Sequence, residues 1–181
     1  AGMFSLPRQT AASAAASKRS PSSKPLPSKV LKRISPAKVV DVHCHYLSPV
    51  VGAKYAHLHP AKHDATAVYA TELSRQVNMK QIQERGAKFN QVEVRIKDMD
   101  KMGIDLQVIS PAPIQYFYFT EPQLGARISR DINESIAMVV EQRPDRFVGM
   151  GTIPLQDAEL AIQELEYAVN VLGLRGVEIC T

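Results

Sequence analysis

The sequence predicts an α/β fold with a parallel sheet. Short apolar runs alternate with longer stretches in which apolar residues recur at helical spacing, the pattern of strands joined by crossover helices. The chain lacks GxGxxG and GxxxxGK(S/T), the glycine-rich motifs of nucleotide-binding open sheets. The pattern alone leaves two architectures open, a doubly wound sheet and part of a (β/α)8 barrel. A barrel needs about 250 residues, so this chain of 181 residues would hold only part of one.

Four strands and three main helices are expected. The strands are placed at residues 39–43, 106–110, 147–150 and 176–180. The helices are placed at 92–102, at 120–143 with Thr120 as the N-cap, and at 157–172 before Gly173. The second helix has an apolar stripe of Ile128, Ile132, Ile136, Val139 and Val140. In the first helix, Val94, Met99 and Met102 are expected to face inward.

A long polar segment, residues 46–90, follows the first strand. A loop of this length inside a compact domain is usually functional or partly helical, and 65–83 has weak helical periodicity. Arg75 and Arg85 lie in this segment, and the guanidinium fork of either matches a substrate carboxylate, although each can equally be a solvated surface residue. The segment also holds His57, His59 and His63, which are either solvent-exposed or folded over the site as substrate contacts or an acid.

Charge divides the chain into a leader and a body. Residues 1–40 contain eight of the 22 Lys and Arg and no acid, whereas the rest has 14 basic and 18 acidic residues, a net charge of −4. We expect residues 1–37, rich in Ser, Ala, Pro and Lys, to be a disordered basic leader, and 38–181 to form the barrel part. The body's charge does not indicate nucleic-acid binding.

The cysteine count and the hydropathy of the chain indicate which cellular compartment to expect. The chain has two cysteines, Cys44 and Cys180, and no stretch of 18 apolar residues, so neither a disulfide scaffold nor a membrane span is expected. A cytoplasmic location is the simplest expectation. A mitochondrial one is the alternative if the acid-free leader is a transit peptide, although its five prolines argue against an amphipathic helix.

The strongest chemical signal is Asp41-Val42-His43-Cys44-His45 at the end of the first strand. Because side chains alternate along a strand, Asp41, His43 and His45 are expected on one face, with Val42 and Cys44 on the other. Two imidazoles on one face at a strand end can ligate one metal ion, and neutral imidazole is a common ligand of zinc that also suits several other transition metals. The plain alternative is a pair of hydrogen-bonded histidines.

Three further features have both a functional and a structural interpretation. The aromatic run 116–119 can wall a pocket for a flat substrate, or fill a hydrophobic cluster or dimer interface. Glu178 can face a barrel interior, where it would need a partner. Arg95 can pair with Asp98 and is expected to be structural.

Several segments together resemble a known family. They are 40–45 (VDVHCH), 94–105 (VRIKDMDKMGID), 108–113 (VISPAP), 143–149 (RPDRFVG), 153–157 (IPLQD) and 172–179 (LGLRGVEI). The chain is similar to the decarboxylase branch of the amidohydrolase superfamily, the enzymes like aminocarboxymuconate semialdehyde decarboxylase. The likeness is nearly continuous over 40–181, except in the loop 46–90.

The resemblance implies a metal-dependent (β/α)8 barrel, of which this chain covers about the first half. It implies one divalent metal, usually zinc, with His43 and His45 as its first two ligands. The third histidine ligand, the aspartate and the acid or base would all lie beyond Thr181. A substrate-binding arginine belongs in the loop after the first strand, where Arg85 and Arg75 are the candidates, and a homodimer is possible.

The resulting expectation is a non-oxidative decarboxylase, a carbon–carbon lyase that acts on an unsaturated or aromatic carboxylic acid. One alternative is a hydrolase that uses the same metal to attack an ester, lactone or amide. The other is a catalytically incomplete half-barrel that acts as a binding partner.

Overall fold

The computed structural model describes residues 39–180, so the predicted disorder of residues 1–37 lies outside the described residues. The strands are β1 (Val40–Tyr46), β2 (Leu106–Pro111) and β3 (Phe147–Gly149). The helices are α1 (Pro49–Lys54), α2 (Ala65–Val68), α3 (Glu72–Asn90), α4 (Val92–Met102), α5 (Pro122–Gln142) and α6 (Ala158–Asn170). Short 3-10 helices are η1 (Ala56–Leu58), η2 (Pro60–Lys62) and η3 (Pro113–Gln115).

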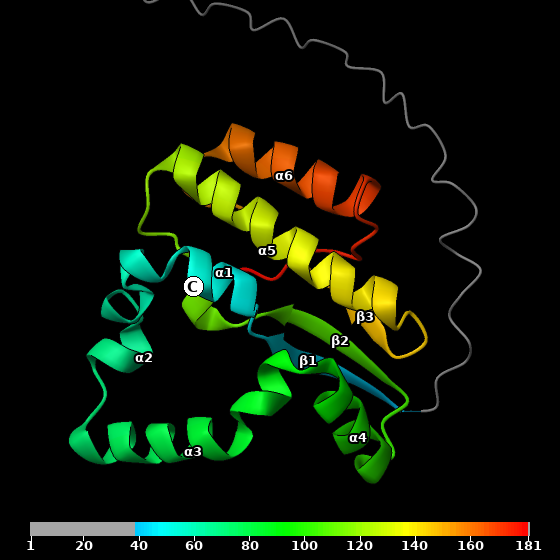
Figure 1. The fold of residues 1–181 in the computed structure, drawn as a ribbon. Coiled ribbons are helices and arrows are strands. Elements are labelled where there is room, and N and C mark those ends of the chain that lie inside the picture. The colour runs from blue at the N-terminus through cyan, green and yellow to red at the C-terminus, as the bar shows by residue number, and fades with distance from the viewer. Residues whose placement is uncertain (1–38, 181) are drawn as a thin grey trace, which may run out of the picture.

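The sheet decides between the two predicted architectures. Its strands run parallel in the order β1-β2-β3, each beside its neighbour in the chain. In the classic doubly wound sheet the first three strands have this order too, but the fourth lies beside β1. Here the next segment instead pairs just after β3, where Val177 makes a parallel bridge with Gly151. The chain therefore forms part of a (β/α) barrel, with α5 and α6 side by side above the sheet and α3 and α4 below it in Figure 1.

The predicted fourth strand is reduced to one point of pairing. Val177 makes an isolated parallel bridge with Gly151, supported by hydrogen bonds from Gly151 N to Gly176 O and from Glu178 N to Gly151 O. Strand β3 ends at Gly149, so residues 176–180 pair with the segment that follows β3 and not with β3 itself.

The helix predictions are confirmed with shifts at their ends. Helix α4 covers 92–102 as predicted and ends at Gly103, whose φ of 69° is in the left-handed region that glycine adopts easily. Helix α6 begins after Asp157, whose side chain accepts a bond from Leu160 N at 2.9 Å. Helix α5 begins later than predicted, with Glu121 as its N-cap, because the Thr120 hydroxyl donates to Phe117 O instead.

The apolar core lies between the sheet and its helices. The stripe of α5 is buried as predicted, with Ile128, Ile132 and Ile136 at most 1% exposed. Met99 of α4 is also fully buried, but the expected inward position of Met102 is wrong, because it is 56% exposed while Ile96 and Arg95 are buried.

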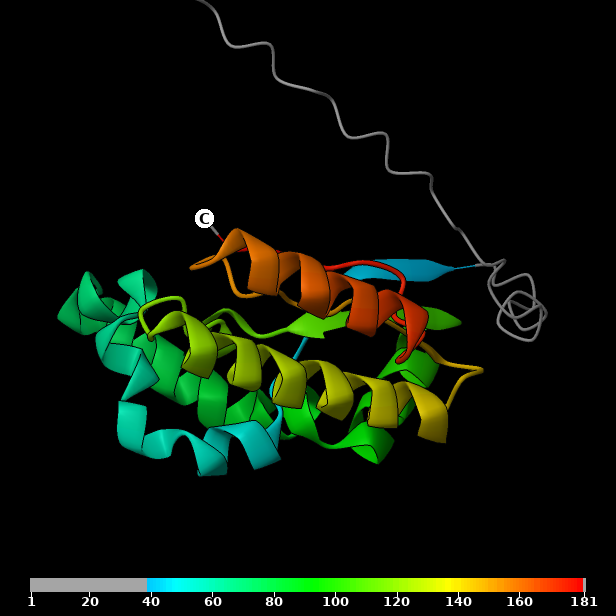
Figure 2. The same cartoon turned by 90° about the horizontal axis from the view of Figure 1, so that it is seen from above.

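The long segment after β1 is more helical than predicted. The weak signal at 65–83 corresponds to two helices, α2 and the 19-residue α3, and no residue of α3 is buried. The Thr71 hydroxyl caps α3 by accepting from Ser74 N at 3.2 Å. In Figure 2 the helices α5 and α6 again lie side by side. None of the helices formed by residues 39–180 has the length and apolarity needed to cross a membrane.

Candidate metal and substrate site

Strand β1 contains a bulge between Asp41 and Cys44, so His43 lies within it and His45 follows it. Asp41 is opposite Gln107 on β2, whereas Cys44 is opposite Ile109, so β1 uses one residue more than β2 between these pairs. The bulge interrupts the alternation of side chains and places Asp41 beside Gln107, whose Nε2 donates to Asp41 Oδ2 at 3.4 Å. The prediction that Asp41 shares the histidine face is therefore wrong. Its carboxylate lies near Cys44 instead, and its pKa is lowered by a hydrogen bond from the Cys44 thiol.

The two histidines do lie together. The ring centroids of His43 and His45 are 4.7 Å apart, with the planes at 77°. His45 Nδ1 is 2.9 Å from Pro111 O and 3.5 Å from the Ser110 hydroxyl, both at the carboxyl end of β2. Because a carbonyl only accepts, the neutral ring carries its proton on Nδ1, which leaves the Nε2 lone pair available. This is the arrangement of a metal-ligating histidine held by a carbonyl behind it.

A shallow cavity of about 390 Å³ adjoins these histidines, and it is strongly basic. It is lined by His43, Cys44, His45, Arg85, Lys88, Phe89 and Arg95. The structure thus brings Arg85 to the histidine pair. Arg75 is absent from this lining, lies ten residues earlier on α3 and pairs weakly with Glu72, at 3.7 Å.

Two of the lining cations are already engaged. Lys88 donates to Asp98 at 2.7 Å. The predicted pairing of Arg95 with that carboxylate is wrong, because the hydrogen bonds of Arg95 go elsewhere. Arg95 instead donates to three oxygens, namely His45 O, Gln107 Oε1 and Phe89 O. Lys88 and Phe89 were missed in the sequence because the end of α3 was read as loop.

The loop histidines do not line the cavity beside His43 and His45. His57 and His59 are exposed, and His63 stacks on Phe119 with ring centroids 3.7 Å apart. His63 and Phe119 border a second cavity of about 330 Å³, which shares no lining residue with the basic one.

The aromatic run 116–119 both packs in the interior and lines a cavity, while its role toward a substrate stays a prediction. Tyr116 and Phe117 are 4% and 3% exposed and pack in the interior, yet all four aromatic residues line the second cavity. Phe117 adopts a φ of 53°, which is strained for a bulky side chain. Glu178 lies near Tyr116, and its charge, together with burial of the ring, raises the pKa of the Tyr116 phenol.

Cys44 behaves as a buried structural thiol. It is 7% exposed, and burial followed by the neighbouring Asp41 raises its pKa to about 12. The thiol is therefore protonated near neutral pH and is not a nucleophile in this state.

The donor set fits part of a catalytic metal site. A catalytic zinc site has about three protein ligands and one open position, and His43 and His45 could supply two of the ligands. Within residues 39–180, no group of three or more His, Cys, Asp or Glu side chains is arranged to hold a metal.

Comparisons with known proteins agree with this geometry. Residues 40–181 match the profile of a family described as amidohydrolase. The chain is 38% identical over 87 residues to 2-amino-3-carboxymuconate-6-semialdehyde decarboxylase of Dictyostelium discoideum, a match that covers 48% of this chain and 24% of that protein. It is 34% identical over 84 residues to gamma-resorcylate decarboxylase of Rhizobium radiobacter, a match that covers 46% of this chain and 26% of that protein. The matched part thus spans about a quarter of these curated relatives.

Solved structures show the same fold. A dihydroxybenzoic acid decarboxylase from Polaromonas sp. JS666, with bound manganese and the inhibitor 2-nitroresorcinol, superposes with a TM-score of 0.59 at 22% identity, covering 77% of this chain and 37% of that one. A 5-carboxyvanillate decarboxylase from Novosphingobium aromaticivorans with manganese gives 0.61 at 22% identity, covering 79% and 41%. Since the family profile matches most of the sequence, this chain belongs to the amidohydrolase family.

Proposed function

We propose that this chain is the N-terminal part of a metal-dependent, non-oxidative decarboxylase that acts on an unsaturated or aromatic carboxylic acid. The observation that carries the proposal is His45, whose Nδ1 is held by Pro111 O so that Nε2 is free beside the His43 ring and three cationic side chains. The relatives named as decarboxylases of aromatic or unsaturated acids support it.

His43 and His45 would hold a divalent metal. We propose zinc, because neutral imidazole is a favoured zinc ligand, and manganese is the rival since two neighbouring structures contain it. When bound, the metal would supply a positive charge that orients and polarises the oxygens of the substrate. The remaining ligands and the acid or base are proposed to come from later strands of the barrel.

Arg85 is the proposed carboxylate-binding residue, in preference to Arg75. It lies on the wall that contains His43 and His45, and no ion pair joins it to an acid in the described part of the chain. Its planar donor fork matches the two oxygens of a carboxylate. The predicted role of Arg75 is not proposed further, because that residue lies away from this wall.

The metal proposal is tested by elemental analysis of a purified chain extended through the remaining strands, which would supply the other ligands, beside its His43→Ala/His45→Ala variant. About one metal ion per chain, lost in the double variant, is the expected result, and its identity decides between zinc and manganese. A matched control is His57→Ala/His59→Ala, which removes an HxH pair from the exposed loop. Equal metal content in all three proteins would contradict the proposed ligands.

The reaction type is tested by the product. Release of CO2 from an aromatic acid such as 2,6-dihydroxybenzoate, abolished by His43→Ala/His45→Ala, supports the lyase. A ring-opened acid formed from a lactone supports the hydrolase instead. The assay is made on this chain and on one extended through the remaining strands, and activity in neither, despite bound metal, would favour a half-barrel with a binding role.

Two further proposals concern the whole protein. We place it in the cytoplasm, with the mitochondrion as the alternative, and propose that it forms a homodimer. Localisation of a tagged full-length protein, with and without residues 1–37, tests the first, and sedimentation of that protein tests the second.

A further inference from the structure

Arg95 is a buried cation in the wall of the histidine cavity. The residue is 8% exposed, and burial lowers the pKa of its guanidinium. No ion pair joins it to an acid among residues 39–180, and its hydrogen bonds go to carbonyl and amide oxygens. Burial of a charge without a paired counter-charge is costly, so the position is not explained by stability alone.

The bonds of Arg95 join three segments at one point. Its Nη2 donates to His45 O at 2.6 Å and, at 3.5 Å, to Phe89 O at the end of α3. Its Nη1 donates to Gln107 Oε1 on β2 at 3.2 Å. Gln107 in turn donates to Asp41 at the bulge of β1, so the contacts extend to both sides of His43 and His45.

A backbone hydrogen bond joins β1 and α3 at the same point. Leu47 N, directly after β1, donates to Phe89 O at 3.0 Å, the same oxygen that Arg95 reaches. Phe89 follows Lys88 and lies one helical turn after Arg85. The end of the histidine strand is therefore tied to the part of α3 that carries the cations of the cavity.

We propose that Arg95 is a positioning residue, which fixes His45 on β1 against the Arg85 turn of α3 and so sets the separation of the metal-binding and carboxylate-binding groups. The roles of His45 and Arg85 in this statement rest on the proposed function. The junction itself does not, because each of its bonds is independent of metal and substrate.

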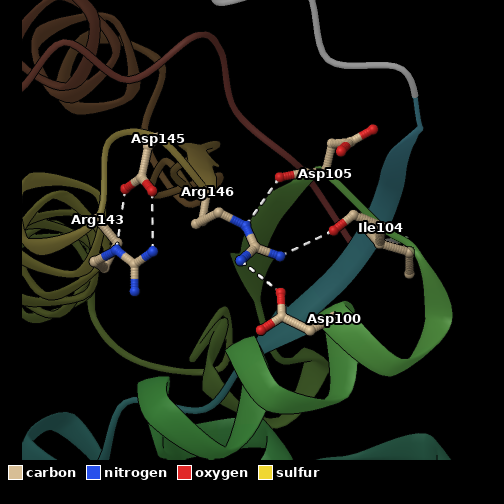
Figure 3. A network of polar contacts seen from close by, with 6 residues as sticks. All are labelled: Asp100, Ile104, Asp105, Arg143, Asp145 and Arg146. Atoms are coloured by element: carbon tan, nitrogen blue, oxygen red, sulfur yellow. Dashed lines mark hydrogen bonds and ion pairs between the residues drawn. The ribbon is translucent and has the colours of Figure 1, made fainter.

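Arg146 provides a matched control at the other end of β2. It also donates to two carbonyls, Asp105 O at 3.1 Å and Ile104 O at 3.0 Å, and it pairs with Asp100 at 2.7 Å (Figure 3). Its side chain is 17% exposed, and it contacts none of the residues that line the histidine cavity in these bonds. Loss of Arg146 should destabilise the fold without loosening the β1–α3 junction.

The test compares Arg95→Met, Arg95→Lys and Arg146→Met in the 181-residue chain. Ring ¹⁵N spectra, recorded at a pH where imidazole is neutral, report the tautomer of His45, and the His45→Gln variant assigns its signals. Amide hydrogen exchange reports how well the Leu47 N–H is protected by its bond to Phe89 O. In Arg95→Met, we expect a mixture of His45 tautomers and exchange at Leu47 at least about tenfold faster, as for loss of a charge-assisted bond. Arg146→Met should keep the Nδ1–H tautomer and change Leu47 exchange less than about twofold.

Arg95→Lys keeps the charge but not the fork, so it should fold and show an intermediate effect on both readouts. If Arg95→Met unfolds, Arg95→Lys decides alone: wild-type exchange at Leu47 and a single His45 tautomer would overturn the proposal. Equal effects of Arg95→Met and Arg146→Met would also overturn it, since they would show general destabilisation. If the chain extended through the remaining strands binds no metal while the 181-residue chain shows the expected pattern, the proposed function is contradicted and the positioning role stands.

Discussion

At the scale of single residues, Glu164 is a carboxylate enclosed between two helices. It is 3% exposed, and it accepts from Arg130 Nε on Oε2 and from Asn133 Nδ2 on Oε1, each at 2.8 Å. Asn133 also accepts from Thr152 N at 2.7 Å, so the same group links α5 to the segment after β3. Burial nevertheless outweighs these bonds and raises the pKa of Glu164.

This shift gives stability a defined pH dependence. Because the folded protein holds the proton more tightly than the unfolded chain, the contribution of Glu164 is greatest below its unfolded pKa of about 4.3 and is lost as pH rises through the higher folded value. We expect the free energy of unfolding of wild type, relative to Glu164→Gln, to fall from about pH 4 to pH 7. Urea titrations across this range measure it.

Glu166→Gln, an exposed neighbour on α6, is the control and should show no such trend relative to wild type. A difference between wild type and Glu164→Gln that grows with pH would mean that the bonds from Arg130 and Asn133, rather than burial, dominate the charge of Glu164.

The histidines show what a local motif can and cannot predict. The closeness of His43 and His45 follows from their spacing on a strand, and it is present in the structure. The position of Asp41 does not follow, because the bulge depends on pairing with β2, more than sixty residues away in sequence. The proximity of Arg85 to this pair depends equally on the docking of Phe89 to Leu47, and the sequence only narrowed the choice to Arg75 and Arg85.

At the scale of elements, α5 is held by its apolar stripe. Ile132 is 1% exposed in the middle of that stripe. Ile132→Ala should lower the free energy of unfolding by about 2–5 kcal/mol, through lost burial and the cavity left behind. Denaturant titration measures the change, with an unchanged dependence on denaturant indicating the same unfolding reaction.

Met138, on the same helix and 61% exposed, offers a comparison in which little burial is lost. Met138→Ala should change the free energy of unfolding by about 0.5 kcal/mol or less. Comparable losses from both substitutions would mean that the stripe does not carry the packing of α5.

The elements were predictable in proportion to their amphipathicity. Helix α5, with its regular stripe, was placed to within a few residues, since burial of one face fixes both its length and its orientation. Helix α3 has no buried face, so only its capping residue and its helix-forming composition indicate it, and these signals are weak in a sequence. The fourth strand was predicted as a full element because its alternation is clear, although the structure pairs it at a single bridge.

At the scale of the whole molecule, the unpaired edge of β1 affects how the chain associates with other chains. In the described part of the chain β1 pairs only with β2, and the strand start exposes Val39, Val40 and Val42, which are 47%, 44% and 71% exposed. In a closed barrel every strand has two neighbours, so this edge would be covered. An apolar, unpaired edge favours association with other chains, and lysines on such an edge oppose it.

We therefore expect the 181-residue chain to self-associate as its concentration rises, and Val40→Lys/Val42→Lys to shift it towards the monomer. The substituted side chains are already exposed, so the melting temperature at low concentration should change little. Sedimentation velocity over a concentration series measures the association, and Ile162→Lys, which changes an exposed apolar residue on α6 away from the edge, is the control. If the wild-type chain stays monomeric throughout, the β1 edge drives no association and the half-barrel is stable alone in solution. If Ile162→Lys acts as strongly as the edge variant, the β1 edge is not the specific surface that drives association.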